Sequence, residues 1–387
     1  MQQQSVDVAI IGAGAAGVGF GVVLRDLGLD RFAILERDEV GASFEQWPEQ
    51  MRFITPSFTG EAFGHLDLNS IALETSPAYT LQHEHPSGPE YAQYLRDVAS
   101  YFDLPVARGV EVTEILPLPE MDRFMLQTNQ GTVESRFVVW AAGEFQYPHR
   151  PEFPGAEFGV HSADVSQWQE QWQDMEARPM NSESMNGHPM NGEFMDGDPV
   201  VIIGGYESGI DTALMLVKQG VPVHVLDRNE PWNDQHPDPS VTLSPHTKQR
   251  LRRAQPNPSL TLEGNVTVDG IEKNGDSYVV RSADERHWST AVPPILATGF
   301  RGSERSIQDC FEWQDERYPL LTEQDESTCT PGLFLIGPGV CHGEVPFCFI
   351  YKFRQRFPVV AETIARRLDI DTSPIDMYRE AGFYLDD

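Results

Sequence analysis

Short apolar runs rich in β-branched residues alternate with longer amphipathic stretches along this chain of 387 residues. Residues 6–11 form a run suited to a strand buried on both faces, and residues 15 to about 27 are expected to be helical. A second apolar run at 31–35 completes a strand, helix and strand unit. The same order of elements returns after residue 199, so the pattern predicts an α/β fold.

Glycines fill the connection between the first predicted strand and its helix. Gly12, Gly14 and Gly17 form a GxGxxG motif: one glycine permits the tight turn, one lets the backbone approach a pyrophosphate, and one lets the helix pack closely. The helix then points its N-terminal amides at the phosphates. Glu36 ends the next strand nineteen residues after Gly17, where it can accept hydrogen bonds from ribose hydroxyls. We therefore predict a dinucleotide site.

A second turn of the same kind follows the apolar run at 199–203. Its glycines are Gly204, Gly205 and Gly209, and Asp227 ends the next predicted strand eighteen residues after Gly209. Tyr206 stands where the middle glycine is expected, so that either its side chain intrudes near the pyrophosphate or the turn takes another course. Two such units predict two cofactors. A Rossmann-like unit without a ligand is the alternative for the second.

Two further predicted strands end in small residues. Residues 137–143 end in Ala-Ala-Gly, and residues 295–299 end in Ala-Thr-Gly. Such endings let a crossing segment lie against a bound cofactor.

The region after Glu36 adds a more specific pattern. Residues 41–44 read Gly-Ala-Ser-Phe, residues 47–48 read Trp-Pro, residues 51–56 read Met-Arg-Phe-Ile-Thr-Pro, and residues 161–162 read His-Ser. With the two glycine turns, these motifs resemble the flavin-containing monooxygenase-like oxidoreductases, within the superfamily of two-dinucleotide flavoproteins that includes the pyridine nucleotide-disulfide oxidoreductases. The resemblance implies FAD at the first turn and NADPH or NADH at the second.

The resemblance extends from Asp7 to about Leu368, with two departures. Phe158, Gly159 and His161 are closer together than in the monooxygenase fingerprint, and Pro338 stands where many flavoproteins carry an aspartate that contacts the flavin. That contact must then come from elsewhere.

The resemblance implies two Rossmann-like, three-layer domains, with the NAD(P) domain inserted into the FAD domain. We expect the FAD domain at 1–165 and 296–387, and the NAD(P) domain at 199–295. Residues 166–198 are expected to form a short helix and a flexible insert, in which methionine recurs every five residues from Met175 to Met195.

The resemblance also implies which residues contact the cofactors. The FAD candidates are Gly12, Gly14, Ala16, Gly17, Glu36, Arg37, Ser43, Phe44, Trp47, Val112, Ala142, Gly143, Gly337 and Cys348. The NAD(P) candidates are Gly204, Gly205, Tyr206, Glu207, Ser208, Gly209, Asp227, Arg228, Thr298 and Gly299. Asp227 favours a free 2′-hydroxyl whereas Arg228 can receive a 2′-phosphate, which leaves NADH and NADPH open, and the resemblance inclines to NADPH.

Four residues are candidates for catalysis: Arg52, His161, Arg301 and Cys348. His161 is alternatively a structural histidine at a loop corner. Cys348 lies near the start of the last predicted helix, at about 346–368, where it is either a nucleophile of lowered pKa or a small packing residue. No metal site is expected, because the cysteines form no pair with ligand spacing.

Three functions are compatible with these motifs. The resemblance implies oxygenation of a small organic substrate through a flavin hydroperoxide. A thioredoxin-reductase-like disulfide or quinone reductase is the second, although the chain has no CxxC motif and no cysteine in its first glycine turn. A flavin- or nucleotide-binding sensor without turnover is the third, because of Tyr206 and Pro338.

The net charge of the chain argues against polyanionic partners. The chain carries 59 acidic and 28 basic side chains, a net charge of -31, which would repel nucleic acids and anionic membranes. Only four of the basic residues are lysine, and we expect a high-salt environment in which salt screens the self-repulsion. Four cysteines and no apolar span predict a cytoplasmic protein. The arginines of the last helix are expected to face solvent or to pair with a second subunit in a homodimer.

Overall fold

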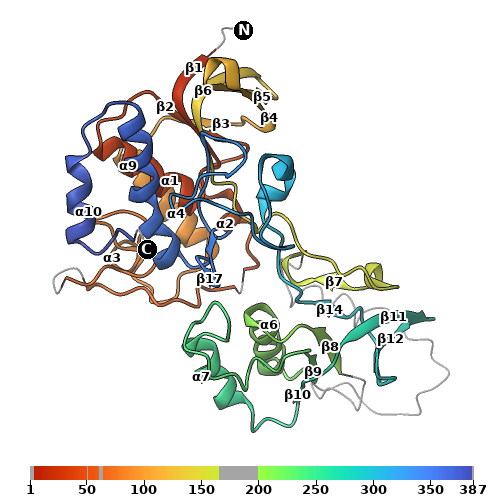
Figure 1. The fold of residues 1–387 in the computed structure, drawn as a ribbon. Helices are drawn as coiled ribbons and strands as arrows, with labels where there is room; N and C mark the ends of the chain where they lie inside the picture. The colour runs from red at the N-terminus through yellow and green to blue at the C-terminus, as the bar shows by residue number, and fades with distance from the viewer. Residues whose placement is uncertain (1–3, 50, 61–63, 165–198, 386–387) are drawn as a thin grey trace, which may run out of the picture. The chain divides into compact units, whose positions relative to one another are not determined.

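The computed structural model describes residues 4–49, 51–60, 64–164 and 199–385. The expected helix and methionine-rich insert at 166–198 lie outside the described residues. The chain forms two compact units (Figure 1), the first made of Met1–Trp47, Thr55–Tyr147 and Phe300–Asp387, and the second of Pro48–Ile54 and Pro148–Gly299.

These limits differ from the predicted domain boundaries at 165 and 296. Residues 148–164 fall in the second unit because the short strand β7 (Val160–His161) pairs with β14 (Ile295–Leu296) in its sheet. His161 therefore belongs to the second unit.

The first unit is built on a mostly parallel sheet. Its strands lie in the order β3-β2-β1-β6-β5-β4, and β15 pairs with β6. Apolar side chains make β1 and β2 suitable for burial on both faces, and Ile10 of β1 is in register with Ile34 on one side and Val139 on the other. The bounds are β1 (Gln4–Ile11), β2 (Phe32–Glu36), β3 (Val106–Arg108), β4 (Val112–Leu118), β5 (Arg123–Thr128), β6 (Gly131–Trp140), β15 (Leu333–Leu335), β16 (Cys341–His342) and β17 (Val345–Pro346).

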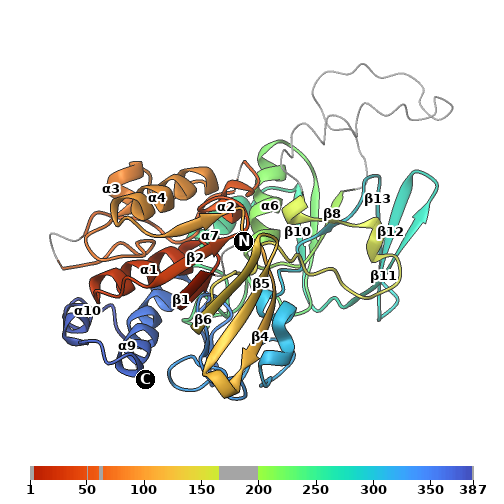
Figure 2. The same cartoon turned by 90° about the horizontal axis from the view of Figure 1, so that it is seen from above.

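The first helix fills the centre of the helical layer on this sheet. Figure 2 shows α1 between α4 and α9, and both helices pack against it. The helices of the first unit are α1 (Ala15–Asp26), α2 (Ala42–Glu45), α3 (Pro77–Leu81), α4 (Gly88–Tyr101), α8 (Ile350–Phe353), α9 (Phe357–Arg367) and α10 (Asp376–Glu380), with 3-10 turns η2 (Pro119–Met121), η5 (Ser303–Cys310), η6 (Arg354–Arg356) and η7 (Ser373–Ile375).

The last predicted helix, 346–368, is wrong in its start and its continuity. It begins at Ile350 as α8, passes through the 3-10 turn η6 and resumes as α9. Pro358 lies in the first turn of α9 and lacks the N–H that would continue the hydrogen-bond ladder from α8. Arg354 and Arg356, which were expected on a solvated or intersubunit face, are buried.

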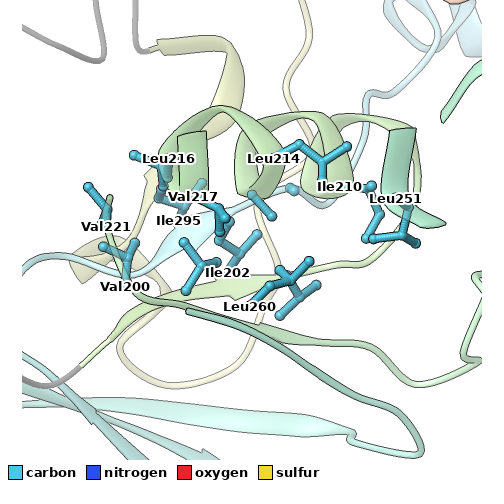
Figure 3. Close-up of a cluster of buried hydrophobic side chains, with 14 of the residues drawn as sticks. Val200, Ile202, Ile210, Leu214, Leu216, Val217, Val221, Leu251, Leu260 and Ile295 are labelled. Atoms are coloured by element: carbon cyan, nitrogen blue, oxygen red, sulfur yellow. The ribbon is translucent and has the colours of Figure 1, made fainter. Parts of the chain in front are cut away.

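The second unit repeats the architecture on a smaller sheet in the order β10-β9-β8-β14-β7, which is parallel throughout. Figure 3 shows the cluster of buried side chains between β8 and α6, to which Val200 and Ile202 of β8 and Ile210 and Leu214 of α6 contribute. The bounds are β8 (Val200–Ile203), α6 (Glu207–Lys218), β9 (Val223–Leu226), α7 (Pro245–Ala254), β10 (Leu260–Glu263), β11 (Val268–Asn274), β12 (Ser277–Ser282) and β13 (His287–Thr290), with 3-10 turns η3 (Ala156–Phe158) and η4 (Ser162–Asp164).

Strands β11, β12 and β13 form a separate antiparallel sheet. No helix in the described part of the chain is both long and apolar enough to cross a membrane.

Candidate functional site

The first glycine turn joins β1 to α1 and uses its three glycines differently. A Cβ on Gly12 would lie 2.8 Å from the Ala141 carbonyl oxygen, and one on Gly17 would lie 1.9 Å from the Gly12 carbonyl oxygen. Gly12 also has a φ of 102°, in the region that favours glycine. A Cβ on Gly14, by contrast, would meet nothing within 4 Å. Two glycines therefore permit close packing, and the third borders open space where a ligand can approach the backbone.

The start of α1 is suited to hold an anion in that space. Gly14 is its N-cap and has no side chain to accept from the first amides of the helix. Helix α1 runs for 12 residues with no acidic residue in its first turn. The N-terminal amides and the positive end of the helix dipole are thus available to a pyrophosphate.

Glu36 ties the end of β2 to this turn. Its carboxylate accepts hydrogen bonds from the backbone N–H of Ala13 at 2.6 Å and of Asp38 at 2.7 Å. A carboxylate offers about four lone-pair sites, so that ribose hydroxyls can still be accepted. The side chain is buried at the carboxyl end of the strand, the edge at which ligands bind in such sheets.

The second glycine turn reproduces these contacts almost atom for atom. A Cβ on Gly204 would lie 2.2 Å from the Ala297 carbonyl oxygen, and one on Gly209 would lie 1.9 Å from the Gly204 carbonyl oxygen. Asp227 accepts from the backbone N–H of Gly205 and of Asn229, each at 2.7 Å. Both units therefore present the same turn, helix and carboxylate, as the spacing of the two motifs predicts.

Tyr206 leaves the course of the second turn unchanged. Its φ and ψ are -82° and -164°, and those of Gly14 are -80° and -167°. Of the two possibilities at this position, the structure shows a side chain added to an ordinary turn. Burial, followed by the charge of Asp227, raises the pKa of the Tyr206 hydroxyl, and a hydrogen bond with Asn229 opposes the rise.

Two side chains of the second unit occupy places that the motif does not reveal. The carboxylate of Glu207 caps the start of α7, where it accepts from the Ser244 backbone N–H and, at 2.5 Å, from the Thr247 hydroxyl. Because the Glu207 side chain is bonded to α7, only its backbone faces the glycine turn. Trp232 lies against Gly205, where a Cβ would approach its ring to 2.5 Å. Local sequence gives no signal for Trp232, because it follows Asp227 in an irregular loop.

The remaining FAD candidates surround the first turn or lie one layer away. A Cβ on Gly337 would lie 3.3 Å from the Ala16 Cβ, which places the end of β15 against the start of α1. The backbone N–H of Val110 donates to the Glu36 carbonyl oxygen at 2.8 Å, so the segment leading to the half-buried Val112 passes the end of β2.

Other FAD candidates are held by packing. Ser43 and Phe44 lie on the short helix α2, and the Phe44 ring is 5.3 Å from that of Trp47 and 4.9 Å from that of Tyr91. Ala142 and Gly143 follow β6 directly. The guanidinium of Arg37 donates to the Gln146 side chain.

The candidates at the end of β14 are held together with two histidines. The Thr298 hydroxyl donates to the His149 carbonyl oxygen, and the His149 backbone N–H donates to the Gly299 carbonyl oxygen at 2.9 Å. His161 Nε2 lies 3.0 Å from the same Gly299 oxygen, while His161 Nδ1 accepts from the Ala163 N–H at 3.1 Å. His161 is fully buried, and burial lowers its pKa. This geometry is that of a neutral structural histidine.

Replacing His161 with alanine is expected to lower the free energy of unfolding by about 1–3 kcal/mol, because it removes a fully buried side chain and leaves the Ala163 N–H without its acceptor. The pKa of His161 is lowered in the folded state, so the unfolded chain takes up this proton first below about pH 6.5. Wild-type protein should therefore lose stability toward acid more steeply than the variant. Urea unfolding at several pH values tests this. A large loss of turnover with unchanged stability would instead indicate a catalytic role.

The other catalytic candidates are scattered. Arg52 is exposed in the second unit and donates to the carbonyl oxygens of Glu49 and Met51, whereas Arg301 is exposed in the first unit. Cys348 is half-buried and precedes the N-cap of α8 by one residue. In the described residues, no group of three or more His, Cys, Asp or Glu side chains could hold a metal ion.

One titratable side chain beside the first site has no signal in the motifs. Glu304 is buried, and burial together with the charge of Glu144 raises its pKa to about 7. The two glutamates are 160 positions apart in the sequence, so local patterns cannot bring them together.

Comparison with known proteins places these two turns in a family. A family model described as pyridine nucleotide-disulphide oxidoreductase matches residues 9–176 and 179–337, which include both turns. Bacilliredoxin reductase Bdr of Bacillus subtilis is 23% identical over 92% of this chain and 97% of its own length. An uncharacterized CzcO-like oxidoreductase of Geobacillus kaustophilus is 31% identical, but that match spans only 39% of this chain and 40% of the relative.

A solved structure shares the fold over 95% of the chain. A flavin-containing monooxygenase from Stenotrophomonas maltophilia superposes with a TM-score of 0.68 at 17% identity, over 95% of this chain and 100% of that one. This likeness supports the two-domain architecture, and the family match covers most of the chain. The chain belongs to the pyridine nucleotide-disulphide oxidoreductase family and is an oxidoreductase that uses FAD and NAD(P)H.

Proposed function

We propose that this oxidoreductase is a flavin monooxygenase. It would insert one oxygen atom of O₂ into a small organic substrate and release the other as water, while one NAD(P)H and one proton are consumed. Bound FAD would supply the electron transfer and the oxygen activation. The residues that would hold it are those of the turn from Gly12 to Gly17 together with Glu36, and the residues from Gly204 to Gly209 with Asp227 would hold the nicotinamide dinucleotide.

The protonation state of the Cys341 thiol favours this proposal over a mechanism in which two protein cysteines pass electrons to a disulfide. A protein dithiol that passes electrons to a disulfide needs a thiolate. Cys341 is buried, its thiol donates to the Gly343 carbonyl oxygen at 3.6 Å, and burial raises its pKa. The thiol thus stays protonated at neutral pH. It lies near Cys348, the other cysteine of this segment, so this pair is poorly suited to act as a redox dithiol.

A disulfide or quinone reductase is the second candidate. The full-length match to a bacilliredoxin reductase supports it, and such an enzyme would have to pass electrons from FAD directly to its acceptor. The two candidates differ in what happens to oxygen. Monooxygenation predicts equal amounts of NADPH oxidised, O₂ consumed and product oxygenated, with little hydrogen peroxide released.

The proposal is tested by measuring the amounts of NADPH, O₂ and substrate consumed under air, and of NADPH and acceptor consumed without oxygen. We expect NADPH to bleach the flavin anaerobically. Small disulfides and quinones should then oxidise the reduced flavin only slowly. Under air, a panel of amines, sulfides and ketones should include one compound that lowers the release of hydrogen peroxide. Rapid anaerobic turnover with a disulfide or quinone would contradict monooxygenation. A flavin that NADPH does not bleach would favour the non-catalytic sensor.

The exposed Arg228 is expected to select NADPH. Arg228 is exposed and directly follows Asp227 at the strand end, where a guanidinium can receive the 2′-phosphate of NADPH. Its replacement with alanine should raise the KM for NADPH about 10- to 100-fold, the effect of losing a charge-assisted hydrogen bond, with little change for NADH. Initial rates with both nucleotides measure this, and the exposed Arg252→Ala is the control. Equal effects on both nucleotides would contradict phosphate recognition.

A further inference from the structure

Two acidic side chains lie close together at the carboxyl edge of the first sheet. Glu144 follows the end of β6 by four residues, and Glu304 lies in η5. Glu304 is only 3% exposed, and Glu144 is half-buried. Burial raises the pKa of both carboxyls, and their mutual repulsion adds to the rise for Glu304.

The backbone around Glu304 is fixed by its neighbour Ser303. The Ser303 backbone N–H donates to the Gly143 carbonyl oxygen at 2.9 Å, and the Trp140 indole N–H donates to the Ser303 hydroxyl at 2.9 Å. Both bonds hold the start of η5 against the end of β6. Glu304 is therefore placed by the sheet and does not sit on a mobile loop tip.

The Glu304 carboxylate fits where it does because two neighbouring glycines have no side chain. A Cβ on Gly302 would lie 1.8 Å from its Oε1, and a Cβ on Gly339 would lie 3.0 Å from its Oε2. Gly339 follows Gly337, which packs against Ala16 in the first turn of α1. The carboxylate thus lies beside the segment that borders the FAD glycine turn. Pro338, between the two glycines, offers no side-chain acceptor.

Neither carboxylate has a hydrogen-bond donor from another residue within the described part of the chain. The Glu304 carboxylate accepts a hydrogen bond from its own backbone N–H. Two charged groups face the pair: Arg305 acts on Glu304 and Arg317 acts on Glu144, each through its charge and without a hydrogen bond. Buried polar groups are nearly always paired, and leaving one unpaired is costly. A buried carboxylate with no donor from another described residue, beside a half-buried one, is suited to a ligand that brings donors.

The order of groups in FAD identifies those donors. Glu36 lies at the adenosine ribose position and the glycine turn at the pyrophosphate, so the polyol chain that follows the pyrophosphate is the next group with hydroxyls. We propose that Glu304, supported by Glu144, accepts hydrogen bonds from the ribityl hydroxyls of bound FAD. The proposal concerns cofactor binding and does not depend on which electron acceptor the enzyme uses.

The affinity for FAD tests the proposal. The dissociation constant for FAD is obtained from the fraction of FAD that diluted holoenzyme releases. Relative to wild type, we expect this constant to be about tenfold higher in Glu304→Gln and about a hundredfold higher in Glu304→Ala. The exposed Glu316→Gln, in the same segment, should leave the constant unchanged. An FAD analogue lacking one ribityl hydroxyl should bind more weakly than FAD to wild-type protein, and this difference should shrink in Glu304→Ala.

Two further readouts separate a binding role from a structural one. Wild-type affinity for FAD should rise about tenfold from pH 6 to pH 8 as the carboxyl loses its proton, and it should be flat in Glu304→Gln. Flavin-free Glu304→Gln should unfold at the same temperature as flavin-free wild type or higher, because a repulsive buried pair is relieved. Lowered stability of the flavin-free variant with unchanged FAD affinity would overturn the proposal.

Discussion

Replacing Gly209 with alanine is expected to slow reduction of the flavin by NADPH on the order of 100-fold while FAD stays bound. The added Cβ would lie 1.9 Å from the Gly204 carbonyl oxygen and 2.9 Å from its carbonyl carbon. These are backbone atoms of the turn itself, so no side-chain rotation relieves the overlap. The turn must move away from α6, which disturbs the bond from the Gly205 N–H to Asp227. Displacement of about 1 Å at such a site costs on the order of 100-fold in rate.

Anaerobic mixing with NADPH, followed by the flavin absorption band, measures the effect. Dithionite should still bleach the variant, which shows that its FAD is competent. Gly220→Ala provides a matched control at the other end of α6: Gly220 has a φ of 86° but open space at its Cβ, so the change strains the backbone without touching the turn. Reduction of Gly209→Ala at the wild-type rate would show that this turn does not bind the nucleotide.

The corresponding change in the first unit should have a different result. A Cβ on Gly17 would overlap the Gly12 carbonyl oxygen at the same 1.9 Å. Gly17→Ala is thus expected to yield protein with little bound FAD, and the flavin content of the purified variant measures it. The two variants together assign one cofactor to each turn.

Both turns are predictable from the sequence because their chemistry is local. The glycines, the helix and the strand-ending acid lie within about 30 residues, and each residue type has one steric or electrostatic reason to be there. The family expectation and the α/β fold are confirmed for the same reason. Tyr206 illustrates the limit, since the motif cannot show that its backbone keeps the geometry of a glycine.

Contacts between distant segments are not predictable in this way. Glu304 meets Glu144 only because η5 and β6 come together in the folded unit, and nothing in the local pattern of either segment indicates the pair. Arg356 was expected on a solvated or intersubunit helix face, yet it is 2% exposed. A helical stripe shows which residues share a face, but burial of a charge depends on a partner elsewhere in the chain.

The partner of Arg356 makes its removal the most damaging single change expected for stability. Arg356 Nε and Nη2 donate to the two carboxylate oxygens of Asp325 at 2.9 and 3.1 Å, and its Nη1 donates to the Leu385 carbonyl oxygen at 2.5 Å. Asp325 is fully buried, and His342 Nε2 lies 2.5 Å from its Oδ1. Arg356→Ala leaves this buried carboxylate without its guanidinium partner and with His342 alone beside it, and is expected to lower the free energy of unfolding by about 3–5 kcal/mol.

Denaturant unfolding at fixed salt measures this loss. Arg96→Ala is the matched control, because Arg96 pairs with Glu45 at 3.1 Å on the exposed surface and should cost only about 0–1 kcal/mol. Asp325→Asn in the Arg356→Ala background should recover part of the stability, since the stranded charge is then removed. Equal losses for Arg356→Ala and Arg96→Ala would mean that water reaches the Asp325 carboxylate. The basic residues of the C-terminal helices would then act on the surface, as their sequence alone suggests.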